Sequence, residues 1–343
     1  MPELTTTKRF FIREHPMDST VFHGGIVNKD IEHVLRRNGF IPLSLSAHTD
    51  FGLWAKLKRI KSVFSLLFSI PSNSIVFFQS PLHGQLHVLL VKLFCRFRRN
   101  VQVICCITDL DGLRDQDAKF LQKELSLFKQ IDSFVVHNEL MKTWLLNHVP
   151  HAKASTLEFF DYLAEPNLQQ RSISNQVVFA GNFSKATFLS HLHEVPELDF
   201  LLYGKNEFGD SQLSTNIYYK GMYPAYEVPN HLEGSFGLVW DGDSIDGIEG
   251  GYGEYLRWNS PHKLFLYILS ALPVICPIGS ATESLVGKYG IGFSVASLHG
   301  IGERIRLLTL GEYEGMQENC RKLAPKIAGG HCLMAALQAF MDS

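Results

Sequence analysis

The sequence alternates between short apolar runs and stretches with helical spacing. In the first half the apolar runs occur at 8–14 (KRFFIRE), 74–79 (SIVFFQ), 101–108 (VQVICCIT) and 133–137 (SFVVH), with helical patterns between them. Runs of this kind are typical of parallel strands that are buried on both faces of a sheet. The alternation therefore predicts right-handed βαβ units and a doubly wound α/β domain.

The same alternation starts again after a polar stretch, 165–176, which lacks a periodic apolar pattern and is interpreted as a linker. A chain of 343 residues is long enough for two domains of about 150 residues each. The prediction is an N-terminal Rossmann-like domain at 1–168, a C-terminal Rossmann-like domain at 177–322, and a C-terminal helix at 323–343, with packing against the first domain as one option. Two such domains would face each other across a cleft.

Local charge is more informative than the net charge of −2, which gives no reason to expect a nucleic-acid partner. Residues 51–108 contain no Asp or Glu but eight basic residues: Lys56, Lys58, Arg59, Lys61, Lys92, Arg96, Arg98 and Arg99. In 53–68, apolar residues recur at helical spacing among four of these cations. The stretch 53–99 is interpreted as contacting an anionic membrane surface. A core helix with solvated lysines is the alternative.

The six cysteines include no CxxC spacing and are expected to be reduced, buried thiols. The polar N-terminus does not resemble a signal peptide, and no apolar run reaches the roughly 20 residues that span a bilayer. We therefore expect a cytoplasmic protein that lies peripherally at the inner face of the cell membrane.

Two loops in the second half could bind phosphate. The run at 177–180 leads into Gly181 and Asn182, with Lys185 close behind, and the next strand ends at Tyr203 and Gly204. A loop of this type exposes backbone N–H groups at a helix start, where a phosphate can bind. An ordinary strand-to-helix turn explains the same pattern.

The segment Ser260-Pro261-His262-Lys263 is more specific. Pro261 suits the first turn of a helix, because its missing N–H would have no partner there. The free N–H groups of that turn, together with Lys263, form a compact site for a diphosphate. A capped helix that packs on a sheet remains the alternative.

An ordered set of motifs carries a family resemblance. GSFGLVWDGD, NSPHKLFLYILSALPVIC and ESLVGKYGIGFSVASL in the second half, and IVFFQSP, VICCITDLDGLR, IDSFVVHNELMKTWL and FFDYL in the first, resemble the bacterial glucosyltransferase-3 and galactofuranosyltransferase family. Each motif is loose, but their order is fairly specific and spans about residues 8–325. Members of this family build surface polysaccharides, O-antigens and adhesin glycans.

The resemblance implies a GT-B fold with a UDP-sugar donor in the C-terminal domain and an acceptor in the N-terminal domain. Carried over by position, Lys185 matches a basic residue near the diphosphate, Tyr219 a nucleotide contact, and the run Ser260, Pro261, His262, Lys263 and Leu264 the segment around the phosphates. Tyr203 and Tyr223 are weaker matches. Galactofuranose is the first expectation for the transferred sugar and glucose the second; the acceptor would be a glycan, often lipid-linked. Self-association is expected, and no cofactor is.

Transfer requires stabilisation of the UDP leaving group, which Lys185 and Lys263 could provide. With inversion, a base must also take the proton of the acceptor hydroxyl. The candidates are Asp109, which we favour, His15 and Asp18; each has an alternative role in shaping a turn or capping a segment. The residues expected to line the acceptor site are Asp18, Ser19, Thr20, His23 and Gly24.

The long acidic and glycine-rich insertion at 241–259 is interpreted either as a lid or as a surface loop. Two Asp-x-Asp pairs, Asp109/Asp111 and Asp241/Asp243, could hold a divalent cation. Because cations and helix starts are available to neutralise the diphosphate, no metal is expected.

Two other functions stay open. A sugar-nucleotide epimerase would use a similar pair of domains and would convert a UDP-sugar without an acceptor. A non-catalytic partner subunit would use the basic face and would not bind UDP. A nicotinamide dehydrogenase is disfavoured, because no strand is followed by GxGxxG.

Overall fold

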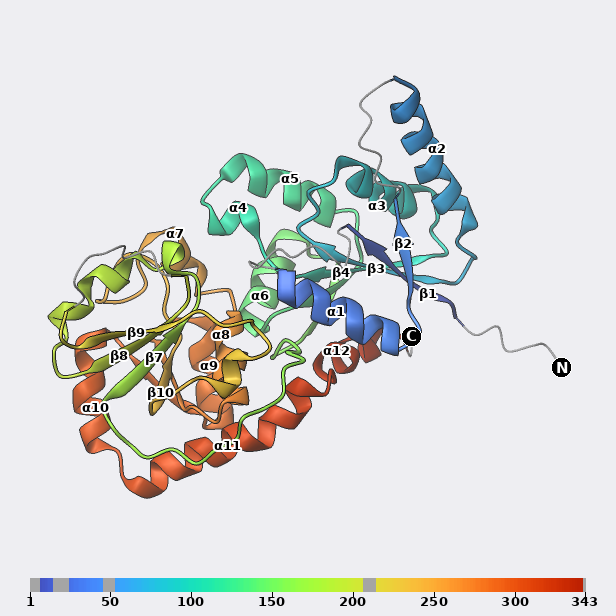
Figure 1. Ribbon diagram of the computed structural model, residues 1–343. Coiled ribbons are helices and arrows are strands. Elements are labelled where there is room, and N and C mark those ends of the chain that lie inside the picture. Colours follow the sequence, from blue (N-terminus) through green and yellow to red (C-terminus); the bar gives the residue numbers. More distant parts are fainter. Residues whose placement is uncertain (1–6, 15–24, 46–52, 206–213, 342–343) are drawn as a thin grey trace. The chain divides into compact units, whose positions relative to one another are not determined.

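The computed structural model describes residues 7–14, 25–45, 53–205 and 214–341. The chain divides into two compact units (Figure 1). The first unit comprises residues 1–157 and 333–343, and the second comprises residues 158–332.

The described part of the first unit contains a six-stranded sheet of order β2-β1-β3-β4-β5-β6, in which all neighbours are parallel. Its strands are β1 (Arg9–Arg13), β2 (Ile41–Ser44), β3 (Ile75–Ser80), β4 (Gln102–Ile107), β5 (Ser133–Val136) and β6 (Lys153–Thr156). Its helices are α1 (Gly25–Arg37), α2 (Leu53–Ser69), α3 (Gln85–Phe97), α4 (Asp111–Arg114), α5 (Ala118–Phe128) and α6 (Glu139–His148). The central strands β3 and β4 are almost entirely buried, as their continuous apolar runs predict.

The second unit contains another parallel sheet, of order β12-β11-β10-β7-β8-β9 in the described residues. Its strands are β7 (Gln176–Ala180), β8 (Asp199–Tyr203), β9 (Ile217–Gly221), β10 (Phe236–Leu238), β11 (Val274–Pro277) and β12 (Gly292–Val295). The α-helices are α7 (Gly250–Tyr255), α8 (His262–Leu269), α9 (Ala281–Tyr289), α10 (Ile301–Leu307) and α11 (Leu310–Ala328), and the 3-10 helices are η1 (Phe183–Lys185), η2 (Thr187–Glu194), η3 (Val228–Asn230) and η4 (Leu298–Gly300).

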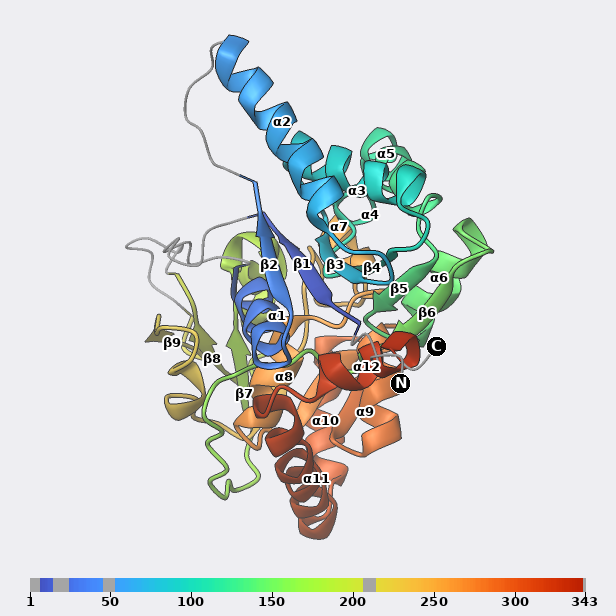
Figure 2. The same ribbon diagram turned by 90° about the vertical axis from the view of Figure 1, so that its right-hand side faces the viewer.

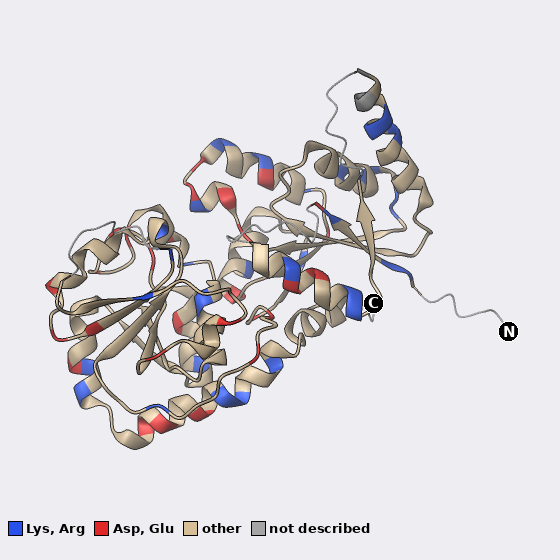
Figure 3. Ribbon diagram, viewed as in Figure 1, with Lys and Arg blue, Asp and Glu red and all other residues tan. Residues whose placement is uncertain are grey.

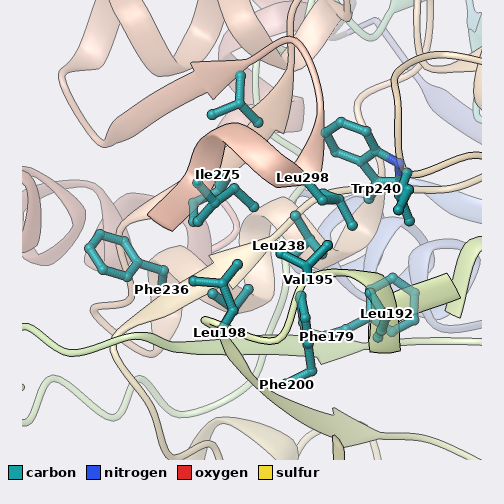
Figure 4. Packing of buried hydrophobic residues seen from close by; sticks show 14 of the residues in the cluster. Phe179, Leu192, Val195, Leu198, Phe200, Phe236, Leu238, Trp240, Ile275 and Leu298 are labelled. Atoms are coloured by element: carbon teal, nitrogen blue, oxygen red, sulfur yellow. The ribbon is translucent and has the colours of Figure 1, made fainter. Parts of the chain in front are cut away.

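The core of the second unit is rich in aromatic side chains (Figure 4). The Phe179 and Phe188 rings pack edge to face with their centroids 5.4 Å apart. The Phe236 and Tyr313 rings also pack edge to face, with a centroid distance of 5.2 Å. Trp240 is fully buried, and its indole N–H donates to the Ser244 carbonyl at 2.9 Å. Trp240 thereby fixes the chain that leaves β10, where the candidate site begins.

The polar stretch interpreted as a linker belongs to the second unit. Arg171 is buried, and its guanidinium donates to the carbonyls of Ser270 and Gly234. The Arg171 backbone exchanges two hydrogen bonds with the Gln317 side chain. The division comes at 157/158, before the predicted boundary, and the buried hydrogen bonds of Arg171 hold this otherwise largely exposed stretch to the second unit.

The chain rejoins the first unit at Leu333, ten residues later than the predicted start of the terminal helix at 323. The helix involved is α12 (Cys332–Met341). Within the first unit, the Ser155 hydroxyl donates to the Ala336 carbonyl at 2.8 Å and ties α12 to β6.

Candidate functional site

The strand order of the second unit reverses at β7. From β7 the chain continues to β8 on one side, whereas β10 lies on the other side and leads on to β11. Ligands of open parallel sheets bind beyond the carboxyl ends of the strands at such a switch point. The candidate site therefore lies where β7 ends at Ala180 and β10 ends at Leu238.

Tyr267 of α8 joins these two strand ends from inside the protein. Its buried hydroxyl accepts a hydrogen bond from the Ala180 N–H at 2.9 Å and donates to the Leu238 carbonyl at 3.1 Å. Gly237 leaves the space that this ring fills, because a Cβ there would lie 2.2 Å from the ring. This contact fixes α8 against the fork between the strands, and Lys263 lies one turn earlier on the same helix.

Lys263 is the central cation of the site. Its Nζ donates to the Trp240 carbonyl and to Asp241 Oδ1, both at 2.7 Å, and lies 4.4 Å from the centroid of the Phe179 ring. Phe179 belongs to β7, and Trp240 and Asp241 directly follow β10. The ammonium group therefore lies at the switch point itself.

Burial opposes the charges of this ion pair. It lowers the pKa of Lys263 and raises the pKa of Asp241, while the charge of each group counteracts the shift of the other. Lys185 supplies a second positive charge, which lowers the pKa of both groups. A dianionic ligand would relieve this cluster, because it brings negative charge to two cations that share one carboxylate.

Lys185 ends η1, in the loop that follows β7, and its Nζ lies 5.2 Å from the centroid of the Tyr252 ring. Asn182 accepts hydrogen bonds from the N–H and hydroxyl of Ser184, which fixes the start of that loop. Gly181 donates its N–H to the Tyr203 carbonyl and lies close to the Lys263 side chain. The structure thus brings Gly181, Lys185 and Lys263 together at the switch point, and their role toward a phosphate stays a prediction.

The start of α8 follows Pro261, and no side chain caps it. Ser260 and Leu264 are buried and support this turn. The centroids of the His262 and Tyr162 rings lie 4.3 Å apart. Burial lowers the pKa of His262 to about 4, so its imidazole is neutral at pH 7. Its Nε2 has no hydrogen-bond partner among the described residues. Lys263 therefore supplies the charge of this segment, with the N–H groups of the uncapped turn beside it.

The strand ends at β8 and β9 serve mainly to shape the site. Gly204 approaches so closely that a Cβ would lie 2.2 Å from the Gly181 carbonyl oxygen. Tyr203 is buried, its hydroxyl accepts from the Glu233 N–H, and burial raises its pKa to about 12. Tyr219, half-exposed on β9, donates its hydroxyl to the Gly204 carbonyl at 3.0 Å. The Tyr223 ring stacks on His231 with a centroid distance of 3.8 Å. The roles of these tyrosines toward a nucleotide stay predictions.

The insertion 241–259 is folded and includes α7. Its Gly242 exchanges backbone hydrogen bonds with the η1–η2 segment, and Asp243 Oδ1 accepts from the Thr187 hydroxyl at 2.5 Å. Tyr252 of α7 meets Lys185. The insertion is therefore packed beside the cationic site, which neither confirms nor contradicts its interpretation as a lid.

The Asp241/Asp243 pair is divided between two partners, since Asp241 binds Lys263 and Asp243 binds Thr187. In the described ranges, no group of three His, Cys, Asp or Glu side chains has a metal-binding arrangement.

Asp109 lies in the first unit, two residues beyond the end of β4. Its Oδ1 accepts the Leu110 N–H at 3.2 Å, and its Oδ2 forms an ion pair with Arg114. Asp111 binds the same guanidinium at 2.8 Å. The carboxylate is partly exposed, so its assignment as the base stays a prediction. His15, Asp18, Ser19, Thr20, His23 and Gly24 lie outside the described residues.

Two residues of this site were not predicted for the roles that they have. Asp241 was considered only as half of a metal-binding pair, and Tyr267 only as part of an apolar helix. The signal for Asp241 is its position directly after the run FGLVW, at the carboxyl end of a strand.

Comparisons with known proteins cover nearly the whole chain. The glucosyltransferase 3-like N-terminal domain model matches residues 11–159, and the glucosyltransferase 3-like C-terminal domain model matches residues 177–340. The chain is 28% identical over 248 residues to the beta-1,6-galactofuranosyltransferase WbbI of Escherichia coli K12, covering 70% of this chain and 72% of the relative. It is 24% identical over 314 residues to glucosyltransferase 3 of Streptococcus gordonii, covering 89% of this chain and 90% of the relative.

Solved structures with the same fold share little sequence. Anabaena HepE in complex with UDP and glucose matches with a TM-score of 0.60 at 11% identity, covering 97% of this chain and 99% of HepE. The sucrose-phosphate synthase of Thermosynechococcus elongatus matches with a TM-score of 0.64 at 13% identity, covering 98% and 100%. This likeness confirms the predicted GT-B fold of two Rossmann-like domains.

Proposed function

The chain belongs to the glucosyltransferase 3-like family and is a glycosyltransferase, and from this premise we propose that it transfers one sugar from a UDP-sugar to a glycan. The observation that carries the proposal is Lys263, held at the switch point of the second unit by the Trp240 carbonyl and by Asp241. A buried cation at this position, with a second cation nearby, suits a nucleoside diphosphate.

The donor site would act on the leaving group. As the bond between sugar and phosphate breaks, negative charge develops on UDP, and preorganised cations stabilise it most where water is excluded. Lys263 and Lys185 supply the charge, and the uncapped first turn of α8 supplies N–H groups. We infer that Lys263 exchanges its bond to Asp241 for a phosphate oxygen when the donor binds. No metal is needed for this step.

The acceptor side would supply the base. We propose an inverting reaction in which a carboxylate of the first unit takes the proton of the acceptor hydroxyl, with Asp109 as the first candidate. Asp18, Ser19, Thr20, His23 and Gly24 are proposed to line the acceptor site.

Galactofuranose is our first proposal for the transferred sugar, and the relative WbbI supports it. Glucose is the second, supported by the name of the Streptococcus relative. The acceptor would be a lipid-linked glycan in surface polysaccharide synthesis, and the enzyme would act as a homo-oligomer in the cytoplasm, at the inner face of the membrane. No helix in the described ranges is long and apolar enough to cross a bilayer.

Calorimetric titration with UDP tests the donor site. We expect micromolar binding that survives EDTA and is lost in Lys263→Ala, whereas Lys322→Ala, a control at an exposed lysine of the same unit, should bind like the wild type. Absence of UDP binding by the intact protein would contradict the proposal and favour a non-catalytic partner subunit. Conversion of a UDP-sugar without any acceptor would instead favour an epimerase.

A further inference from the structure

An apolar stripe on α2 faces solvent. Trp54, Leu57, Phe64 and Phe68 are spaced three, seven and four residues apart, which places them along one side of the helix, and Ile60 lies beside them. Trp54 is 79% exposed and Phe68 70%. Single exposed apolar residues are ordinary on a protein surface, but a continuous row on one helix marks an interaction site.

The stripe is not part of the core of the first unit, because a different side of α2 packs there. Val63 and Leu67 lie in the core of the first unit. Arg98, which follows α3, donates to the Leu67 carbonyl at 2.5 Å and also to the Ile70 carbonyl. In Figures 1 and 2 the start of α2, which carries Trp54, projects past the sheet of the first unit.

Exposed cations occur on α2 itself and at the end of α3, and this part of the sequence contains no acidic residue. Lys58 and Lys61 are exposed on α2, and Arg96 and Arg99 are exposed at the end of α3, next to Phe97, which is 66% exposed. Residues 51–108 contain no Asp or Glu. Figure 3 accordingly shows basic and uncharged positions along α2 and no acidic one.

We propose that this α2 face, formed by the apolar stripe with Lys58 and Lys61, docks the protein on an anionic lipid bilayer. The aromatic and aliphatic side chains would enter the boundary between headgroups and acyl chains, and the lysines would contact anionic headgroups. A second copy of the chain is a poorer occupant, because a symmetric contact would bring the same cations against each other.

The α2 face gives a physical means for the proposed membrane contact and would bring the enzyme to a lipid-linked acceptor. Vesicle binding requires neither UDP nor turnover. Failure of this inference can therefore be distinguished from failure of the proposed transferase function, which UDP titration tests.

Trp54 provides a direct probe. Trp144 and Trp240 are buried and Trp258 is partly buried, so the most exposed tryptophan lies at the proposed contact. Mixing the full chain with vesicles of equal parts phosphatidylcholine and phosphatidylglycerol should shift its fluorescence to the blue. The shift should be absent in Trp54→Phe and with vesicles of phosphatidylcholine alone.

Sedimentation with the same vesicles separates the apolar from the charged contribution. Phe64→Ser with Phe68→Ser should lower vesicle affinity at least about tenfold, and Lys58→Gln with Lys61→Gln by a similar factor that shrinks at high salt. The matched control Leu307→Ser with Leu310→Ser removes apolar residues of the second unit that are 66% and 60% exposed, and it should bind like the wild type.

Three results would overturn the proposal. The intact chain fails to bind anionic vesicles; or it binds zwitterionic vesicles equally well; or the α2 variants retain vesicle binding but lose self-association in analytical ultracentrifugation, which would assign the stripe to a second copy of the chain. Circular dichroism and thermal unfolding like those of the wild type confirm that each variant is folded, because UDP binding reports on the second unit whereas α2 lies in the first.

Discussion

The two units have similar sheets but carry opposite charges at the carboxyl ends of their strands. In the second unit Lys263 and Lys185 lie beyond the switch point, and one carboxylate, Asp241, neutralises part of their charge. In the first unit the loop after β4 carries Asp109 and Asp111 against the single guanidinium of Arg114. Under the proposed function the cations would bind the diphosphate and a carboxylate would take the proton of the acceptor hydroxyl, so the two sheets would provide for the two halves of a transfer reaction.

Among variants that separate acceptor activation in the first unit from UDP binding in the second, Asp109→Asn should have the largest effect on turnover. If Asp109 is the base, the variant should lower kcat by roughly 10²- to 10³-fold, while UDP binding in the second unit stays unchanged. Steady-state kinetics together with UDP titration measure both quantities.

Asp115→Asn is the matched control, because Asp115 binds the same Arg114 guanidinium at 2.7 Å but is more exposed. If Asp109→Asn kept full turnover, the base would be sought at His15 or Asp18. Equal losses in both variants would show that Arg114, and not the Asp109 carboxylate, is what transfer requires.

The fold could be predicted from the sequence wherever a buried strand produces a continuous run of apolar residues. The apolar runs of β1, β3 and β4 predicted buried strands, and the structure confirms them. β2 and β6 were missed because they are four-residue strands at the two ends of the sheet order, where most side chains are only partly buried and the apolar pattern is weak.

The site was predictable only where its chemistry is local in sequence. Pro261, His262 and Lys263 adjoin one another, so a helix start with a cation could be read directly. The bond from Lys263 to Asp241 joins residues 22 positions apart, and the Tyr267 bond to Ala180 spans 87. The folded sheet brings these partners together, so the sequence can place Asp241 at the end of a strand but cannot identify Lys263 as its partner.

Glu124 tests how burial affects the carboxylates at the strand ends of the first unit. Its carboxylate accepts the N–H groups of Asp111 and Gly112 at 3.1 and 3.0 Å, and burial raises its pKa from 4.5 to about 7. The folded state therefore keeps a proton that the unfolded chain releases, and the free energy of unfolding should fall as pH rises from about 4.5 to about 7. Burial also raises the pKa of Asp111, which adds to the decline.

In Glu124→Gln most of this decline should disappear, a difference of up to roughly 3 kcal/mol across the window. Denaturant unfolding of the first unit at several pH values measures it. The control Glu139→Gln removes an exposed carboxylate and should unfold with the wild-type pH profile. A Glu124→Gln variant with the full wild-type decline would show that other groups set the pH dependence of this unit.

The smallest effect is expected from Asp241→Asn, which tests whether Lys263 in the second unit binds the diphosphate. UDP should bind the charged form of Lys263, so affinity should fall as pH rises through the pKa of that lysine. Burial already lowers this pKa, and the Asp241 carboxylate counteracts the shift. Removal of the carboxylate should therefore move the loss of UDP binding to lower pH.

Calorimetric titration of UDP across pH measures the shift. Asp243→Asn is the matched control, because that carboxylate binds Thr187 and not Lys263, and its profile should follow the wild type. An unmoved profile in Asp241→Asn would mean that Lys263 does not titrate in this range or does not contact the diphosphate. The first case predicts that Lys263→Ala still abolishes binding, whereas the second predicts that it does not, so the two variants together decide whether the switch-point cation holds the donor.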